Sequence, residues 1–385
     1  MDRPRVLHVI NGLASGGTEL TLLKLLRAGL ADRFDSRVIS LRSKGWVGEA
    51  IESAGVPVQT LGMSSSFSLP FARSVLQLIG RTYQPDLVQG WLYQGNLAAL
   101  AVASGCQQTT GKRPPVLWGV RQTPAPELRR VPWGQRLILR WSGYRASRVQ
   151  GVIYNSEASR RRHRELGFDA AASDHVLPNG FDLERFRSDP QARQRIRDEL
   201  GLGPGSVLIG AFGRLHEDKD LPNFLSAAAL LAPQAPEAVF VLAGRGVVPG
   251  ARTLGAARRP PLPGRVRLLG ERQDMPALHA ALDILALPSA AESFPNVLGE
   301  AMASAVPAVA TDVGDCAEVL RDPARIVPPK DPQALADALL PLIRDHKLRQ
   351  RLGREGRERA EQEYSLQVAV ERFAALYEER MNDDS

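Results

Sequence analysis

Two glutamates separated by seven residues carry the most specific chemistry in the sequence. Glu292 follows the apolar run 283–287, and Glu300 lies inside the helix expected after Pro295. Carboxylates are good acceptors for neighbouring hydroxyls, and free N–H groups of residues 293–297 at the helix start can donate to phosphate. The spacing indicates a site for one extended ligand that carries hydroxyls and phosphate. The alternative is a capping acid at Glu292 and a solvated Glu300, which the apolar residues around Glu300 disfavour.

Two cations lie on a second loop, directly after the apolar run 207–212. Arg214 follows Gly213, and Lys219 comes five residues after Arg214. Arg offers a planar fork of donors and Lys a compact point charge, so such a pair suits a diphosphate. The carboxyl ends of parallel strands are also where open α/β sheets bind ligands. The alternative is a solvated charged loop.

A glycine-rich turn follows the first apolar run of the chain. Residues 11–19 read NGLASGGTE, and Gly16 and Gly17 precede an expected helix. Backbone N–H groups at such a helix start favour an anionic group or the close approach of a substrate. Because the spacing does not match the strict dinucleotide fingerprint, both ligand contact and a plain tight turn stay open.

Short runs rich in Val, Ile and Leu position these loops. Each run has the length of a strand and is almost wholly apolar, as expected for strands covered on both faces. The runs lie at 5–10, 37–41, 56–61, 86–90, 116–120 and 151–154, and then at 207–212, 238–243, 265–269, 283–287 and 307–310. Helical patterns between them lie at 18–30, 71–82, 96–104, 156–166, 221–231 and 332–343. This alternation predicts an α/β fold with parallel, doubly wound sheets.

The series of strands and helices occurs twice, which predicts two Rossmann-like domains. We expect an N-terminal domain over residues 1–180 and a C-terminal domain over 181–365. The polar stretch 190–200 and the glycine-rich residues after it are typical of a linker. Residues 366–385 are expected to form a helix that returns to the N-terminal domain. The candidate apolar stripe of the last 40 residues consists of Tyr364, Phe373, Leu376 and Tyr377.

The net charge of +7 is concentrated in one segment. Between Arg121 and Glu165 the sequence has 11 arginines and three acidic residues, so the rest of the chain is close to neutral. Residues 129–148 combine arginines with two tryptophans and a tyrosine, a pattern typical of helices that lie on an anionic membrane surface. The alternative is a helix packed on its own sheet with its arginines in water. No nucleic-acid-binding motif accompanies the charge, so we expect no nucleic acid partner.

The composition is that of a globular protein, with 44% hydrophobic and 24% charged residues among 385, and it excludes a mainly disordered or fibrous chain. No apolar stretch approaches the ~20 residues of a membrane span. The start, MDRPRVLHVINGL, lacks the design of a secretory leader. Cys106 and Cys316 are the only cysteines, too few for a disulfide framework. We expect a cytoplasmic protein, with peripheral contact to the inner face of the cytoplasmic membrane as a further hypothesis.

Taken together, the motifs resemble those of the retaining glycosyltransferases of family 4, which have the GT-B fold. The most specific match is the two-glutamate motif within PSAAESFPNVLGEAMASAVPAVATDVGDCAEVL. HVINGLASGGTE, YNSEASRRRHRELGF, LPNGFDLERF and GRLHEDKDL support it, and the resemblance covers nearly the whole chain. It implies two Rossmann-like domains that face each other across a cleft, with the C-terminal helix clasping back.

The resemblance also implies a role for individual residues. Arg214 and Lys219 match the basic pair that binds the donor diphosphate, and Glu292 matches the acid that contacts donor-sugar hydroxyls; these three are the implied catalytic residues. Glu300 matches the acid that contacts the ribose. The implied donor-binding residues are Gly16, Gly17, Gly213, Gly244, Arg272, Phe294, Pro295, Asn296, Val297 and Glu300, with Gly244 and Arg272 near the nucleotide base.

Arg121 and Asn155 are the implied acceptor-side residues, and Arg121 marks a departure from the family pattern. Many relatives have a histidine or an acid where this chain reads VLWGVRQ. Arginine stays protonated and cannot act as a base. The sequence therefore offers no general base at this position.

The resemblance implies the transfer of a hexosyl group from a nucleotide-diphosphate sugar, and UDP is the expected nucleotide. The acceptor would be a saccharide or a lipid-linked saccharide in the synthesis of surface polysaccharide, lipopolysaccharide or glycolipid. We expect no metal and no other cofactor, since no acidic cluster suits a divalent cation. Two alternatives stay open: a UDP-sugar 2-epimerase of the same fold, and a non-enzymatic subunit that binds a sugar nucleotide.

Overall fold

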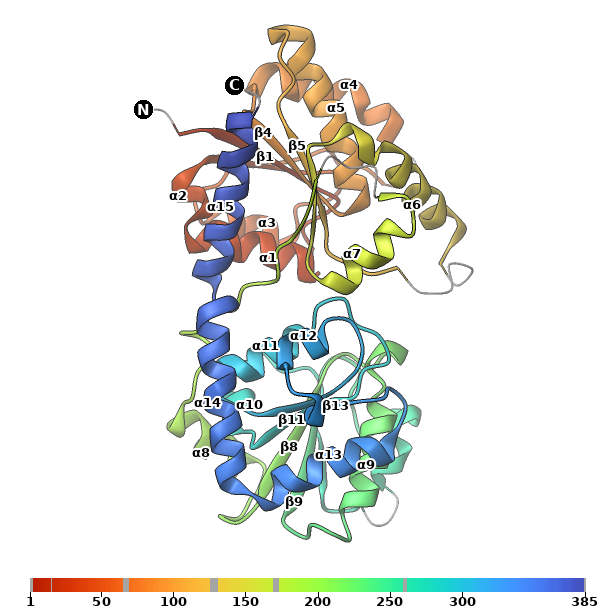
Figure 1. Cartoon of the computed structure of the whole chain (residues 1–385), viewed down its shortest axis with the longest axis vertical. Helices are drawn as coiled ribbons and strands as arrows, with labels where there is room; N and C mark the ends of the chain where they lie inside the picture. The colour runs from red at the N-terminus through yellow and green to blue at the C-terminus, as the bar shows by residue number, and fades with distance from the viewer. Residues whose placement is uncertain are drawn as a thin grey trace. The chain divides into compact units, whose positions relative to one another are not determined.

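The chain forms two compact units, described here from a computed structural model (Figure 1). The structure describes residues 3–14, 16–64, 69–124, 131–168, 173–258 and 262–383. Unit 1 comprises Met1–Gly180 and Leu366–Ser385, and unit 2 comprises Phe181–Ser365. The last helix therefore belongs to the unit that the first 180 residues build.

Unit 1 is built on a parallel sheet whose seven strands, within the described residues, have the order β3-β2-β1-β4-β5-β6-β7. The strands are β1 (Arg5–Ile10), β2 (Asp35–Ser40), β3 (Val58–Thr60), β4 (Leu87–Trp91), β5 (Val116–Val120), β6 (Gly151–Tyr154) and β7 (Asp174–Val176). The α-helices are α1 (Gly17–Leu25), α2 (Ala31–Arg33), α3 (Gly45–Glu52), α4 (Leu69–Tyr83), α5 (Leu92–Thr110), α6 (Trp133–Arg145), α7 (Glu157–Arg164) and α15 (Leu366–Asp383). A π-helical turn, η1 (Leu26–Leu30), and a 3₁₀ turn, η4 (Ala146–Arg148), continue α1 and α6.

Unit 2 repeats this plan with a six-stranded parallel sheet, in the order β10-β9-β8-β11-β12-β13 over the described residues. The strands are β8 (Val207–Phe212), β9 (Ala238–Ala243), β10 (Val266–Leu268), β11 (Ile284–Leu287), β12 (Ala308–Thr311) and β13 (Ile326–Val327). The α-helices are α8 (Pro190–Glu199), α9 (Leu221–Leu231), α10 (Met275–Ala281), α11 (Asn296–Ala303), α12 (Cys316–Leu320), α13 (Pro332–Arg344) and α14 (His346–Glu363). The 3₁₀ turns are η6 (Glu217–Lys219), η7 (Arg252–Arg258) and η8 (Pro323–Arg325).

In both sheets the order in which the chain adds strands reverses at the centre. In unit 1 the chain moves outward from β1 to β3 and then returns to the other side of β1 with β4. In unit 2 it moves outward from β8 to β10 and returns to the other side of β8 with β11. This is the doubly wound arrangement, and the predicted fold class is confirmed. Ligands of such sheets bind outside the carboxyl ends of the strands at this switch point.

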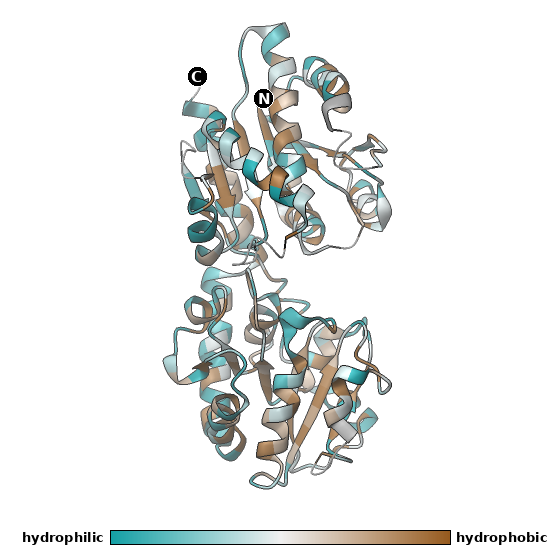
Figure 2. Ribbon diagram, turned by 90° about the vertical axis from the view of Figure 1, so that its right-hand side faces the viewer, coloured by the Kyte–Doolittle hydropathy of each residue, from teal (hydrophilic) through white to brown (hydrophobic). Residues whose placement is uncertain are grey.

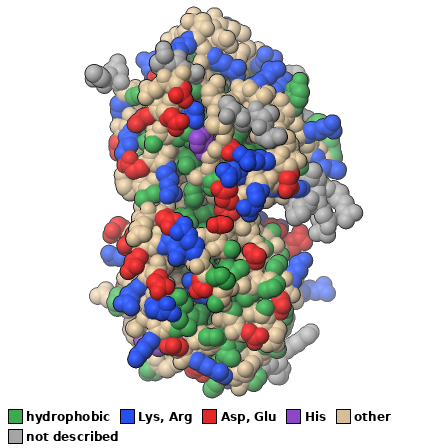
Figure 3. Space-filling view, viewed as in Figure 1, with side chains coloured by type: hydrophobic (Ala, Val, Ile, Leu, Met, Phe, Trp, Pro, Cys, Tyr) green, Lys and Arg blue, Asp and Glu red, His purple; other side chains and the backbone are tan. Residues whose placement is uncertain are grey.

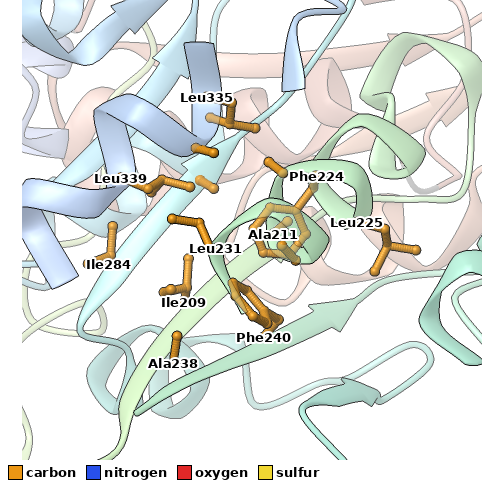
Figure 4. Packing of buried hydrophobic residues seen from close by; sticks show 14 of the residues in the cluster. Ile209, Ala211, Phe224, Leu225, Leu231, Ala238, Phe240, Ile284, Leu335 and Leu339 are labelled. Carbon is orange, nitrogen blue, oxygen red and sulfur yellow. The ribbon is translucent and has the colours of Figure 1, made fainter. Parts of the chain in front are cut away.

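Apolar side chains fill the space between each sheet and the helices on its two faces. In unit 2, α9 and α13 cover one face, where Phe224, Leu335 and Leu339 pack on Ile209 and Phe240 (Figure 4). The strands of both sheets are hydrophobic along their length, whereas the helices are hydrophilic on part of their surface (Figure 2). Burial on both faces explains why the strands are almost continuously apolar.

Three local expectations need correction. The stretch at 190–200 is not a linker, because α8 packs on α10 and buries Ile196 inside unit 2. Two edge strands, β7 and β13, were not predicted, because they have only three and two residues and are only partly buried. The apolar stripe is also divided: Tyr364 lies in the core of unit 2, whereas Phe373 and Tyr377 lie in that of unit 1.

No helix in the described part of the chain is both long and apolar enough to cross a membrane. On the face drawn in Figure 3, basic and acidic side chains are mixed over both units.

Candidate active site

The loops that follow β8 and β11 meet at the switch point of the unit 2 sheet. The two strands are neighbours, with Ile284 opposite Ile209 and Leu285 opposite Gly210. The carbonyl oxygen of Asp218, in η6 after β8, accepts hydrogen bonds from the N–H groups of Ala290 and Ala291 after β11, at 2.8 and 3.2 Å. These two bonds fix the loops to each other.

This junction brings Lys219 and Glu292 into direct contact. The Nζ of Lys219 donates to Oε1 of Glu292 at 2.5 Å, and the Oγ of Ser289 donates to the same oxygen at 2.8 Å. The side chain of Glu292 is 9% exposed and that of Lys219 is 22% exposed. The structure thus places two of the predicted catalytic residues together as a nearly buried ion pair.

The Lys219–Glu292 pair still has hydrogen-bonding groups that can bind a ligand. Among the described residues, the second carboxylate oxygen of Glu292 has no hydrogen-bond partner, and an ammonium group has three donors, of which Lys219 uses one. Glu292 can therefore accept from a ligand hydroxyl while Lys219 donates to an anionic oxygen. A sugar linked to a phosphate offers both groups.

Glycines at two positions allow the loops to approach one another. A Cβ atom at Gly244, where φ is +147°, would lie 2.0 Å from the carbonyl oxygen of Gly213. A Cβ atom at Gly314, where φ is +56°, would lie 2.8 Å from the carbonyl oxygen of Glu292. The stem of Lys219 in turn lies over Gly213. Both glycines are required by the backbone packing around the ion pair, so Gly244 has a structural role beside any contact with a nucleotide.

Helix α11 begins at Asn296, directly after Pro295, and carries Val297 in its first turn. Phe294 anchors this helix start, because its buried ring stacks on Phe181 with 6.2 Å between the ring centroids. The N–H groups of Asn296 and Leu298 donate to the carbonyl oxygens of Phe294 and Pro295, both at 3.0 Å, so in the described residues the N–H of Val297 is the one left in this turn for a phosphate. The side chain of Phe294 therefore serves packing, and a contact of its ring with a ligand is not needed to explain its position.

Glu300 lies on the same helix beside a fully buried histidine. Its Oε2 is 3.5 Å from Nε2 of His279 on α10. This distance is within ion-pair range, but the geometry does not make a hydrogen bond, and neither ring nitrogen of His279 has a partner in the described residues. Phe186 and Phe212 hold the imidazole edge-on, with centroid distances of 5.6 and 5.1 Å. His279 borders the Glu300 carboxylate and limits where it can move.

Two predicted cations of unit 2 differ in their surroundings. Arg214 is exposed and has no ion-pair or hydrogen-bond partner among the described residues. Arg272 binds both oxygens of Asp274 and both oxygens of Glu199, at 2.6 to 3.1 Å, and these bonds raise its pKa. Arg214 is available to a ligand, whereas the guanidinium of Arg272 holds α8 to the loop before α10. A donor-binding role for Arg272 stays a prediction.

In unit 1, Gly16 and Gly17 lie where β1 ends and α1 begins, as predicted. A Cβ atom at Gly17 would meet nothing within 4 Å, while one at Gly16 would collide with the carboxylate of Glu19. Burial raises the pKa of Glu19. The acid therefore occupies the helix start beside Gly16, and Gly17 leaves its side open.

The predicted acceptor-side residues are both inside unit 1. Arg121 is buried; it donates to the carbonyl oxygen of Leu177 at 3.2 Å and to the side-chain oxygen of Asn179. Burial lowers its pKa to about 10. Asn155 is also buried, and its amide donates to the carbonyl oxygen of Arg121 at 3.4 Å. These contacts hold the 177–179 loop on the sheet, and an acceptor role for either residue stays a prediction.

The chain also matches models of known protein families. The family model described as "Glycosyltransferase Family 4" matches residues 15–185, and the one described as "Glycosyl transferases group 1" matches residues 206–345. The chain belongs to glycosyltransferase family 4. The predicted recognition and the prediction of an enzyme are confirmed.

This glycosyltransferase is similar to several named proteins. The lipopolysaccharide core biosynthesis mannosyltransferase LpsB of Rhizobium meliloti is 28% identical, over 64% of this chain and 70% of that protein. The phosphatidyl-myo-inositol mannosyltransferase of Mycobacterium leprae is 26% identical, over 94% of this chain and 93% of that protein. The structure of Anabaena Alr3699/HepE in complex with UDP and glucose superposes with a TM-score of 0.79 at 23% identity, over 98% of this chain and all of that one.

Sequence reasoning missed three parts of the candidate site. Ser289 completes the hydrogen bonds of Glu292, the backbone of Asp218 joins the two loops, and His279 borders Glu300. Ser289 was open to prediction, since a buried polar residue directly after a strand needs a partner. The other two depend on contacts between elements far apart in the sequence. The described residues contain no group of three or more His, Cys, Asp or Glu that could hold a metal ion.

Proposed function

We propose that this enzyme is a retaining hexosyltransferase that uses a nucleoside-diphosphate sugar, with UDP as the nucleotide. The observation that carries the proposal is the ion pair of Lys219 and Glu292 at the switch point of the sheet, with unpaired Arg214 on the same loop as Lys219. Cations are thus beside the position for a diphosphate, and a carboxylate oxygen is free for a sugar hydroxyl. UDP, with or without a sugar, is bound in the structures of Anabaena Alr3699/HepE.

In the proposed reaction the bond from the anomeric carbon to the phosphate oxygen breaks while the acceptor oxygen bonds to that carbon. The departing phosphate takes the proton of the acceptor hydroxyl, so the transfer occurs on one face of the sugar and configuration is retained. Negative charge grows on the phosphate, and positive charge grows on the sugar ring. Arg214 and Lys219 stabilise the first charge, because fixed cations act most strongly where charge develops.

Glu292 and Glu300 have separate positions in this scheme. The free oxygen of Glu292 accepts from a hydroxyl of the transferred sugar, and Glu300 accepts from the ribose hydroxyls. The N–H of Val297, in the first turn of α11, donates to a phosphate between them. We further propose that no metal is needed, since Arg214 and Lys219 supply the positive charge that a metal supplies elsewhere.

The proposed pathway is the synthesis of surface polysaccharide, lipopolysaccharide or glycolipid, with a saccharide or lipid-linked saccharide as acceptor. Two similar proteins support it by name, the lipopolysaccharide core and phosphatidyl-myo-inositol mannosyltransferases. We also propose that the enzyme works in the cytoplasm and contacts an anionic membrane surface peripherally through residues 129–148. Arg129 and Arg130 of this segment lie outside the described residues.

A donor screen tests the proposed function. UDP-sugars and GDP-sugars are supplied with saccharide acceptors, and release of the nucleoside diphosphate is measured together with the anomeric configuration of the product. The proposal expects release that depends on an acceptor, and a retained configuration. An epimerised sugar nucleotide formed without acceptor would identify a 2-epimerase instead. Calorimetric binding of a sugar nucleotide without turnover on any acceptor would identify a binding subunit.

A further inference from the structure

Unit 1 contains a pocket of about 340 Å³ between α4, α5 and α6 that the proposed reaction does not use. Its floor is apolar, formed by Leu76 of α4 and by Leu97, Leu100 and Ala101 of α5. The volume is near the lower end of the range for small-molecule sites. It therefore fits a narrow apolar group, such as part of one hydrocarbon chain.

The rim of the pocket is cationic. Four of the lining residues are arginines and none is Asp or Glu: Arg73, Arg113, Arg145 and Arg148. The Nε atoms of Arg113 and Arg145 are buried without a hydrogen-bond partner in the described residues. The guanidinium of Arg145 lies over the ring of Trp141, 5.1 Å from its centroid. This rim has no carboxylate to neutralise it within the part of the chain that the structure describes.

The arginines of α7 differ from those of the pocket rim. Arg160 and Arg162 pair with Glu157 and Glu165, and Arg164 pairs with Asp174. The basic segment of the sequence thus has two parts, and in the α7 part three of the four arginines pair with acidic residues. Uncompensated charge is concentrated at α6 and at the pocket.

The surface around the pocket is unusually apolar. Nine large hydrophobic side chains are exposed among the described residues, and six of them are on α4 and α6. These six are Val75, Leu78, Trp133, Leu137, Trp141 and Tyr144, with exposed fractions of 44 to 74%. Trp133, Leu137 and Trp141 are each four residues apart and so share one helix face. In Figure 3, the right-hand edge of unit 1 carries Lys and Arg side chains with hydrophobic ones between them.

We propose that this pocket binds an anionic phospholipid of a membrane surface. The phosphate lies at Arg145 and Arg148, since guanidinium groups bind phosphate with paired hydrogen bonds. Part of one acyl chain lies over Leu97 and Ala101, and the exposed aromatic residues of α6 lie at the level of the headgroups. The inference rests on the proposed membrane contact and adds the site and the lipid class that mediate it. A second copy of this surface is a poorer occupant, because arginine would face arginine.

Vesicle flotation of the full chain tests the charge requirement. Phosphatidylcholine vesicles with and without phosphatidylglycerol are compared at low and high salt, for the wild type, Arg148→Glu and Arg161→Glu. Arg161 is an exposed arginine of α7 outside the pocket, so both variants change the net charge equally. Arg148→Glu is expected to lower binding to the anionic vesicles by about tenfold or more, and Arg161→Glu by about twofold. Equal losses in both variants would overturn the proposal.

Quenching by a brominated lipid tests entry of the chain into the pocket. Phosphatidylglycerol with bromine on its acyl chain is added to a Trp133→Phe background, in which Trp141 is the tryptophan on the pocket wall. We expect quenching that Trp141→Phe removes and that Ala101→Phe, which fills the floor, reduces at least severalfold. Ser104 also lines the pocket, and Ser104→Met is the second filling variant. Circular dichroism confirms that each variant is folded. Quenching that neither filling variant reduces would overturn the proposal.

A third measurement separates this inference from the proposed function. Transfer to a soluble acceptor is measured without vesicles, and Arg148→Glu is expected to keep the wild-type rate. Absence of transfer in the wild type together with pocket-dependent lipid binding would contradict the proposed function alone. Normal transfer together with lipid binding that the pocket substitutions do not change would contradict the lipid site alone. Binding of inorganic phosphate that depends on Arg148, without binding of the chain to the anionic vesicles, would also overturn the lipid site.

Discussion

The two oxygens of the Glu292 carboxylate have different surroundings. Oε1 accepts from Lys219 and from Ser289, whereas the other oxygen has no partner in the described residues. The first oxygen is therefore structural and the second is available to a ligand. Lys219 and Glu292 were each expected after a strand, and the family resemblance implied that they belong to one donor site. Their direct contact was beyond prediction, because it depends on the Asp218 carbonyl that joins the two loops.

The proposed contact of Glu300 with the ribose can be tested by the affinity of the protein for UDP. Glu300→Ala removes the carboxylate that we propose accepts from the ribose, so affinity for UDP is expected to fall about tenfold or more. The wild type should bind UDP more tightly than 2′-deoxy-UDP, and the variant should bind both equally. Isothermal calorimetry with the two nucleotides measures this. Glu318→Ala, at an exposed position on α12, serves as the control. A variant that still prefers UDP would show that Glu300 does not contact the ribose.

At the scale of elements, the polar stretch of the sequence forms α8, and the arginines of this helix bind the sheet. Arg193 and Arg197 of this helix both bind Asp283, at 2.6 and 2.9 Å, and Asp283 also accepts from the N–H of Leu208 on β8. The polarity that suggested a linker thus belongs to a helix that uses its arginines for packing. Sequence patterns predict which segments are helical, but they do not say whether polar residues have buried partners.

Asp283→Ala is expected to destabilise unit 2. The substitution leaves Arg197 without its carboxylate at a site where the two side chains are 10 and 11% exposed. Loss of one partner of such a pair costs about 3 kcal/mol. Urea unfolding measures the change, and Asp337→Ala, on the exposed side of α13, should alter stability by less than about 0.5 kcal/mol. Equal effects of the two substitutions would contradict the role of α8.

A buried histidine on α7, His163, is expected to make the stability of unit 1 depend on pH. Burial lowers the pKa of His163 from 6.5 to about 4. Its Nδ1 lies 2.8 Å from the carbonyl oxygen of Ser159, which can only accept, so Nδ1 carries the proton and Nε2 accepts from the hydroxyl of Tyr93 at 2.7 Å. The neutral ring therefore has both of its hydrogen bonds.

Between pH 6.5 and 4 the unfolded chain binds the His163 proton and the folded chain does not. Stability of unit 1 is thus expected to fall as the pH drops through this window, by about 3 kcal/mol at pH 4. Denaturant unfolding at several pH values should show this slope in the wild type and a smaller slope in His163→Gln. Identical slopes would contradict a neutral, buried His163. His8, whose pKa burial lowers to about 3, adds to the remaining slope in both proteins.

At the scale of the whole molecule, the chain ends in the unit where it began. Helix α15 packs against α1, η1 and β4, and it buries Val370, Phe373 and Tyr377 in the core of unit 1. The ring of Phe373 stacks on that of Trp91 with 5.9 Å between centroids. The apolar spacing in the last residues of the sequence indicated a helix that packs. The split of the stripe after Tyr364 was not evident, because periodicity does not identify which sheet a helix covers.

Phe373→Ala is expected to destabilise unit 1 by about 3–5 kcal/mol, because it removes a fully buried ring from a packed core. Hydrogen exchange followed by mass spectrometry should show faster exchange in peptides of α1, β1 and β4. Peptides of α9 and β9 in unit 2 should keep their wild-type rates. Trp46→Ala, at an exposed position of α3, is the control in the same unit. Faster exchange confined to unit 2 would contradict the place of α15.

The central claim is that the Lys219–Glu292 pair carries sugar transfer from a nucleotide sugar. The most direct measurement is acceptor-dependent release of nucleoside diphosphate by the wild type, Lys219→Ala, Glu292→Ala and the control Lys347→Ala, whose lysine is exposed on α14. With folding verified by circular dichroism, we predict a loss of at least about 100-fold in kcat for each site variant and the wild-type rate for Lys347→Ala. Wild-type turnover in both site variants would contradict the account.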